Sequence, residues 1–161
     1  MKTNPMTTSL RDNVIVDKTD PRIELRGKLD SLYALATFVE NMDGGWCKRM
    51  NGFNDLLFGL YLVRQYETDE IDHESLFLEE FLKRVASGTD RERARACKDN
   101  WDVDIRSDEP SAVNYLRTQI REAELVACTV CARYPSTKYA NIHSCLNALS
   151  SMAYWIAAES E

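Results

Sequence analysis

The sequence predicts an all-α fold, arranged as one up-down bundle of five principal helices that resembles a four-helix bundle. Three observations favour this class. Apolar residues recur every three or four positions through most of the chain, which is the spacing of one helix face. No segment alternates apolar and polar residues as a half-buried strand would. The 161 residues include only six glycines and four prolines, whereas an all-β fold needs a turn signal every ten residues or so.

The length favours a single domain with a sizeable core. Residues 1–19 are polar and aperiodic, and they predict a flexible N-terminal arm with at most a short ordered piece at "NVIV". Residues 20–161 then form one helical-bundle domain.

Capping residues and periodicity place the helices. The first is expected to begin at Asp20-Pro21, because Asp is a favoured N-cap and Pro fits the first helical position, and to end at Gly44-Gly45. The other helices are expected over about 46–66, near 73–86, in the short charged stretch "TDRERARACKDN", from Pro110 to just before Pro135, and over roughly 138–158.

The formal net charge is −6, which argues against non-specific binding to nucleic acid, because that function needs a basic surface. Any site for an anion must therefore be a local cluster of Arg and Lys. The common glycine-rich nucleotide motifs and hydrolase motifs are absent from the sequence.

The five cysteines are an odd number without a signal peptide before them, which favours reduced thiols in the cytoplasm. Cys128 and Cys131 form a CxxC inside a helical pattern, but no second pair accompanies them. We interpret them as small buried hydrophobic residues. His73 and His143 lack the spacing of a metal motif, so the sequence predicts no metal site.

The segment from Tyr139 to Ala158 contains no formally charged residue. Its Asn, His and Ser residues make it too polar for a membrane span. We expect a helix that water hardly reaches, buried in the bundle or at a subunit interface, and no membrane partner.

The stretch "LRTQIREAELVA", residues 116–127, places three charged residues within a narrow arc of a helix. These are Arg117, Arg121 and Glu124, beside an apolar stripe. One interpretation is a solvated i,i+3 ion pair between Arg121 and Glu124, worth about 0.3 kcal/mol. The other is an anion site, since two arginines one turn apart repel each other until an anion binds.

Three segments carry motifs that occur together in one family. The segment "DKTDPRIELRGKLDSLYALATF" at 17–38 is similar to Lys-x-Asp-Pro-Arg followed by Gly-x-x-Asp-Glu-Leu, with matches at Lys18, Gly27, Asp30 and Leu32. The stretch "LRTQIREAELVA" is similar to Ala-Arg-x-x-x-Arg-Arg-x-Glu-Arg, with matches at Arg117, Arg121 and Glu124. The stretch "LNALSS" at 146–151 is similar to Asn-Arg-Leu-Ser-Asp, with matches at Asn147, Leu149 and Ser150. Together they resemble the corrinoid (ATP:cob(I)alamin) adenosyltransferases over most of residues 17–158. The wording is most similar to the ethanolamine-utilisation branch, whose helix reads Leu-Arg-Thr-x-x-Arg-Glu and whose last motif ends Leu-Ser-Ser.

The resemblance implies transfer of the 5′-deoxyadenosyl group from ATP to the cobalt of a reduced corrinoid, with release of triphosphate. ATP, Mg²⁺ and cobalamin are the implied ligands. Arg121 and Glu124 would be catalytic. The implied ATP-binding residues are Lys18, Arg121, Glu124 and Asn147. Phosphate chemistry of this kind needs fixed cations more than acid–base groups.

The resemblance also implies quaternary structure. Asp30 and Arg117 match a pair that forms a salt bridge between subunits beside the active site, which predicts a homotrimer. Trp101 falls where the family has a corrinoid-facing aromatic residue. The implied location is cytoplasmic, and the ethanolamine branch adds association with a bacterial microcompartment.

Simpler interpretations of these residues stay open. Trp101 could be a core anchor, and Asp30 could pair with Arg26 on its own helix. Four polar residues on one face of the last helix could serve helix–helix hydrogen bonds; these are Asn147, Ser150, Ser151 and Tyr154.

The chain departs from the family pattern in its N-terminal part. No glycine precedes Gly27, so the glycine-rich stretch that wraps the ATP phosphates is absent, as is the cysteine-rich extension of the ethanolamine branch. Ala148, Ser151 and Glu122 also replace motif residues. A non-catalytic corrinoid-binding or scaffold relative is therefore the alternative function.

Overall fold

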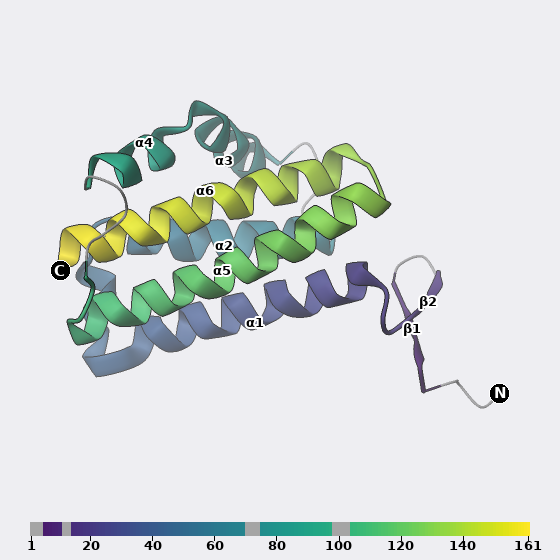
Figure 1. Cartoon of the computed structure of the whole chain (residues 1–161), viewed down its shortest axis with the longest axis horizontal. Coiled ribbons are helices and arrows are strands. Elements are labelled where there is room, and N and C mark those ends of the chain that lie inside the picture. Colours follow the sequence, from purple (N-terminus) through teal and green to yellow (C-terminus); the bar gives the residue numbers. More distant parts are fainter. Residues whose placement is uncertain (1–4, 11–13, 70–74, 98–103) are drawn as a thin grey trace.

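The computed structural model describes residues 5–10, 14–69, 75–97 and 104–161, in which long helices pack side by side (Figure 1). The elements in chain order are β1 (Thr7–Ser9), β2 (Ile15–Asp17), α1 (Pro21–Asn41), the 3₁₀ helices η1 (Met42–Gly44) and η2 (Trp46–Arg49), α2 (Phe53–Glu67), α3 (Leu76–Ser87), α4 (Thr89–Ala96), α5 (Asp108–Arg133) and α6 (Thr137–Ser160). The predicted all-α class is confirmed. The described helices are the five principal ones and the short α4.

Helix α1 begins at the predicted position because its cap is built there. Oδ1 of Asp20 accepts a hydrogen bond from the backbone N–H of Arg22 at 2.9 Å, and Pro21 occupies the first helical position. The hydroxyl of Tyr134, just beyond α5, donates to Oδ2 of Asp20 at 3.0 Å. The Arg22 side chain holds the pKa of Asp20 well below its ordinary value, so the cap is charged at neutral pH.

Helix α2 begins later than its periodicity predicts. The chain passes through η1, η2 and a turn before α2 starts at Phe53. Gly52 forms this turn with a φ of +88°, a left-handed conformation that favours glycine. A Cβ at Gly52 would also lie 2.2 Å from Cη2 of Trp155, so the close approach of α2 to α6 requires a glycine here.

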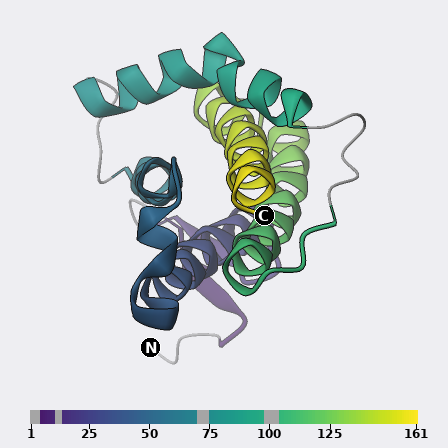
Figure 2. The same ribbon diagram turned by 90° about the vertical axis from the view of Figure 1, so that its left-hand side faces the viewer.

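Helices α3 and α4 lie across α6, on the side away from α1 (Figures 1 and 2). The helix expected near 73–86 is α3, and the part of that expectation around His73 lies outside the described residues. The short helix expected in "TDRERARACKDN" is α4.

Helix α6 is enclosed by helices of the same chain. It packs against α5, α2, α4 and α3, and Figure 2 shows it in the middle of the bundle. Every residue from 150 to 157 is buried. The prediction of a helix that water hardly reaches holds for this second half of α6, which the bundle itself covers, whereas Ala140 and Ser144 in the first half are exposed. Within the described residues, no helix combines the length and apolar character that crossing a membrane requires.

The N-terminal segment contains a small hairpin that lies beside the end of the bundle (Figure 1). Strands β1 and β2 are antiparallel, with Thr7 opposite Asp17. The guanidinium of Arg26 in α1 donates to the carbonyl of Leu10 at 2.8 Å and forms an ion pair with the buried Glu67 at 3.1 Å. These contacts tie the hairpin to α1 and α2.

Candidate functional site

The charged side of α5 lies next to its buried stripe. The stripe residues Val113, Leu116, Ile120, Ala123 and Ala127 are all completely buried. Nη1 of Arg121 lies 2.7 Å from Oε2 of Glu124, so the predicted ion pair forms. Arg121 is half exposed, whereas Glu124 is buried. The pair is therefore more than a solvated surface contact, because its carboxylate has been removed from water.

Arg117 has no carboxylate partner of its own. Its Nε donates to Oδ1 of Asn114 at 2.7 Å, and no ion pair reaches it from the described part of the chain. Burial lowers the pKa of Arg117 from its ordinary value, and the Arg121 cation one turn away adds to this. An incoming anion would relieve both effects.

Helix α6 contributes polar groups beside Arg117 and Arg121. The hydroxyls of Ser150 and Ser151 both donate to the backbone carbonyl of Asn147, at 2.8 and 3.3 Å. These hydroxyls bond within α6 rather than across to another helix, and each oxygen keeps its acceptor capacity. Asn147 is partly exposed.

A third arginine comes from α4, a helix for which the sequence analysis predicted no site residue. Asp90 anchors α4, because its Oδ1 accepts from Nε1 of Trp155 at 3.2 Å and the Arg84 guanidinium donates to both of its oxygens. Arg93 forms an ion pair with Glu159 at 2.6 Å. These links to α6 and α3 fix the adjacent Arg91.

The three helices enclose a pocket of about 420 Å³. Its lining residues are Arg91, Arg117, Arg121, Asn147, Ser150 and Ser151. Three arginines line it, and among the described residues no carboxylate does, so the pocket suits an anion with several negative oxygens. Asn147, Ser151 and Arg91 also line an adjoining groove of about 530 Å³ that extends along α6 towards α3.

The structure brings together some predicted site residues and not others. Arg117, Arg121 and Asn147 line the pocket, and Glu124 adjoins it through Arg121. Lys18 directly follows β2 and is exposed. Its chain neighbours Asp17 and Thr19 line a surface pocket together with Arg133. Arg133 lies twelve residues beyond Arg121 on α5, or about 18 Å at the α-helical rise. Trp101 lies outside the described residues.

Asp30 forms its contact elsewhere in the chain. Its Oδ1 lies 2.9 Å from Nη2 of Arg64 in α2, so the interpretation that it pairs with Arg26 is wrong. Arg26 instead pairs with Glu67. The Asp30 side chain is 68% exposed despite the ion pair, so a second partner can also reach it.

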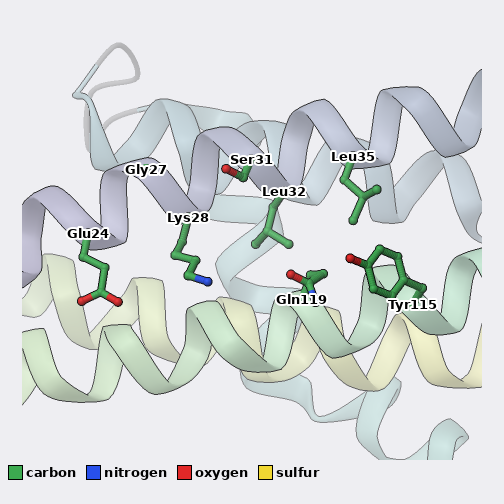
Figure 3. Close-up of a pocket in the computed structure, with 8 residues that line it drawn as sticks. All are labelled: Glu24, Gly27, Lys28, Ser31, Leu32, Leu35, Tyr115 and Gln119. Atoms are coloured by element: carbon green, nitrogen blue, oxygen red, sulfur yellow. The ribbon is translucent and has the colours of Figure 1, made fainter.

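A second concave surface lies between α1 and α5 and has a volume of about 480 Å³. Figure 3 shows Glu24, Lys28 and Leu32 of α1 directed towards α5, which contributes Tyr115 and Gln119 to the groove. Nζ of Lys28 lies 3.1 Å from a carboxylate oxygen of α5, so its charge is already paired. This groove lacks the converging cations of the arginine pocket.

The interpretation of both CxxC cysteines as buried residues is wrong. Cys128 is exposed and Cys131 is partly exposed. Cys145 in α6 is buried, and burial raises the pKa of its thiol to about 12.

An arginine pocket on a bundle of long helices defines a helical protein that can bind a polyanion. Residues 4–159 match the family model described as cobalamin adenosyltransferase, and the chain belongs to that family. No curated protein matches the chain by sequence.

Solved structures with the same fold include two complexes of a PduO-type ATP:corrinoid adenosyltransferase from Lactobacillus reuteri. An arginine-to-lysine variant complexed with ATP is 13% identical to this chain, with a TM-score of 0.71. A phenylalanine-to-alanine variant complexed with cobalamin and ATP is 15% identical, with a TM-score of 0.67. Each comparison covers 96% of this chain and 88% of the other. At such identities the likeness establishes the fold.

Proposed function

We propose that this protein transfers the 5′-deoxyadenosyl group of ATP to the cobalt of a reduced corrinoid, giving adenosylcobalamin and triphosphate. The observation that carries the proposal is that Arg91, Arg117 and Arg121 line one pocket to which the described part of the chain contributes no carboxylate. Membership of the cobalamin adenosyltransferase family supports the reaction. The ATP and cobalamin in the complexes of the Lactobacillus reuteri enzyme support the two substrates.

The reaction needs stabilisation of a leaving polyphosphate. The Co(I) electron pair attacks the ribose C5′, a Co–C bond forms, and the C5′–O bond breaks. The triphosphate leaves with the bonding electrons, and the cobalt is formally oxidised to Co(III). Fixed guanidinium groups stabilise the charge that develops on the leaving oxygen, and Mg²⁺ bound to ATP would share this role.

Individual residues receive distinct roles in this proposal. Arg121 contacts the phosphates and Arg91 adds a second cation, whereas Arg117 pairs beside the site with Asp30 of a neighbouring subunit. Glu124 acts as a positioning residue, because its contact with Arg121 at 2.7 Å fixes the guanidinium. The Asn147 side chain supplies an amide hydrogen bond to the nucleotide or its phosphates.

The proposal includes a homotrimer with the site at subunit interfaces. Asp30 faces α2, whereas Arg117 faces α4 and α6, so the two cannot meet as they lie within one chain. A cyclic trimer joins two different surfaces of each subunit, which is the arrangement that such a pair requires. Lys18 would likewise reach the phosphates of a neighbouring subunit. The sequences of the α5 and α6 motifs support assignment to the ethanolamine-utilisation branch. The odd number of cysteines supports a cytoplasmic location.

The test is anaerobic incubation with ATP, Mg²⁺ and chemically reduced cobalamin, followed by visible spectroscopy for adenosylcobalamin. Arg121→Ala should lower kcat/KM about 100-fold or more, because it removes a cation from the leaving group. Arg133→Ala is the matched control, since it removes an exposed arginine from the same helix outside the pocket.

The non-catalytic alternative predicts a different result in the same experiment. The wild-type protein would bind the corrinoid without converting it, and ATP would not raise its melting temperature. The absent glycine-rich stretch before Gly27 is the feature that favours this alternative. Unfolding of Arg121→Ala, detected by circular dichroism, would show that Arg121 has a structural role instead.

A further inference from the structure

Three side chains from two neighbouring helices bring an oxygen, a sulfur and a nitrogen atom together. They belong to Glu124 and Cys128 of α5 and His143 of α6, and their ligand atoms all lie within 4.8 Å of one another. Two of them already touch, because Nε2 of His143 lies 3.3 Å from Oε1 of Glu124. No role in adenosyl transfer requires this grouping.

The helices explain why these residues meet. Glu124 and Cys128 are four residues apart, so they lie one turn apart on the same side of α5. Helix α6 runs back along α5 after a short connection, and this antiparallel packing places His143 opposite that turn. The sequence alone could not show the grouping, because the spacing between Cys128 and His143 depends on how the two helices are rotated.

The donor set selects a class of metal ion. Thiolate, imidazole and carboxylate are the ligands of zinc and of neighbouring transition ions, whereas Mg²⁺ and Ca²⁺ take oxygen ligands. Zinc bond lengths of about 2.0–2.3 Å and a tetrahedral angle imply ligand atoms roughly 3.3–3.6 Å apart. The Glu124–His143 contact of 3.3 Å is at that distance already, and rotation of exposed Cys128 can supply the remainder.

The surroundings of the cluster also suit an ion. Oε2 of Glu124 lies 2.7 Å from Nη1 of Arg121 without the alignment of a hydrogen bond, so the carboxylate is oriented but not fully satisfied. Cys128 is exposed, and His143 also lines the groove along α6, which provides an entry path from solvent. Three protein ligands leave a fourth position for water.

We propose that Glu124, Cys128 and His143 form a binding site for a zinc ion that joins α5 to α6. This proposal departs from the sequence-based expectation of no metal site, which rested on motif spacing and on the CxxC pair. The relevant partner of Cys128 is the carboxylate one turn before it, not Cys131 three residues after it. The proposal does not depend on adenosyl transfer, since it concerns the metal alone.

The test is titration of the reduced, metal-free full chain with Co²⁺, without ATP or corrinoid. The proposal predicts one Co²⁺ per chain, with a thiolate-to-cobalt charge-transfer band and the strong visible bands of four-coordinate cobalt. Added Zn²⁺ should abolish these bands by displacing the cobalt. Cys128→Ser should remove the charge-transfer band, and His143→Asn should weaken binding about tenfold or more.

Cys131→Ser is the matched control, because it removes the other thiol of the same CxxC, and its spectrum should equal that of the wild type. Circular dichroism verifies that each variant keeps its helices. Absence of the charge-transfer band from the wild-type protein would overturn the proposal. So would a band that survives in Cys128→Ser, or equal cobalt affinity in all the variants, since either result places the ion elsewhere.

Discussion

Arg117 and Arg121 lie one helical turn apart on α5, where like charges repel by a few tenths of a kcal/mol when exposed. The structure places a third cation, Arg91, at the same pocket and supplies a carboxylate only to Arg121. A surface that merely needed solubility would not gather three arginines around one pocket. In the proposed function the triphosphate binds Arg91 and Arg121, and Arg117 pairs beside it with Asp30 of a neighbouring subunit.

Arg91 provides the sharpest test at the scale of single residues. Arg91→Ala should weaken ATP binding about tenfold or more, because a hydrogen bond to a charged group contributes about 1.5–3 kcal/mol. Isothermal titration calorimetry with Mg-ATP measures the change.

Arg95→Ala is the control for the loss of charge, since Arg95 is exposed on the same helix and does not line the pocket. Equal losses in the two variants would mean that α4 contributes only a general positive field. An unchanged affinity in Arg91→Ala would remove Arg91 from the site.

At the scale of elements, the packing around Trp155 connects the core to the pocket. Its ring occupies the space that a Cβ at Gly52 would need, and its Nε1 donates to Asp90 at the start of α4. The guanidinium of Arg93 lies 3.7 Å from the centre of the same ring. The position of Arg91 therefore depends on a tryptophan of α6 that contacts α4 and the turn before α2.

Gly52→Ala should destabilise the fold by about 2–4 kcal/mol, since the new Cβ displaces Trp155 and also strains a left-handed residue. Thermal and urea unfolding followed by circular dichroism measure the loss. The control is Gly44→Ala, where φ is +70° but no atom lies within 4 Å of the new Cβ. It should cost only about 1–2 kcal/mol. Equal losses would show that Trp155 does not fill that space closely.

The elements differ in how far the sequence predicts them. α1, α5 and α6 follow from long apolar periods and from local signals such as Asp20-Pro21, because those signals act within one turn. The delayed start of α2 does not, because Gly52 is selected by contact with Trp155, about a hundred residues away. Arg91 could not be distinguished from Arg95 by sequence, since only the packing of α4 on α6 tells them apart.

The candidate site shows the same division. Arg121 and Glu124 share one helix, so helical geometry predicts their ion pair. The contact of Glu124 with His143 joins two helices, and sequence spacing carries no information on it. The alternative that Asp30 pairs with Arg26 relied on their proximity on α1, but the Arg64 side chain reaches Asp30 from α2.

At the scale of the whole molecule, the proposed trimer is tested by charge reversal. The wild-type protein should have three times the subunit mass of 18.5 kDa in light scattering after size-exclusion chromatography. Asp30→Arg should weaken association by about 2 kcal/mol or more, and adding Arg117→Asp should restore it, since the swapped charges attract again.

Glu79→Arg is the control for reversing an exposed, ion-paired acid on another helix. A wild-type monomer would contradict the trimer. A trimer that Asp30→Arg leaves intact would restrict Asp30 to its contact with Arg64 within the chain.

The central claim is that the arginine pocket holds the triphosphate of ATP while cobalt takes its adenosyl group. The most direct measurement is the product ratio when the wild-type protein, Mg-ATP and cob(I)alamin react anaerobically. We expect adenosylcobalamin and triphosphate in equal amounts, and neither product above background with Arg121→Ala. Cobalamin that stays unalkylated, or ATP cleaved without adenosylcobalamin, would contradict the account.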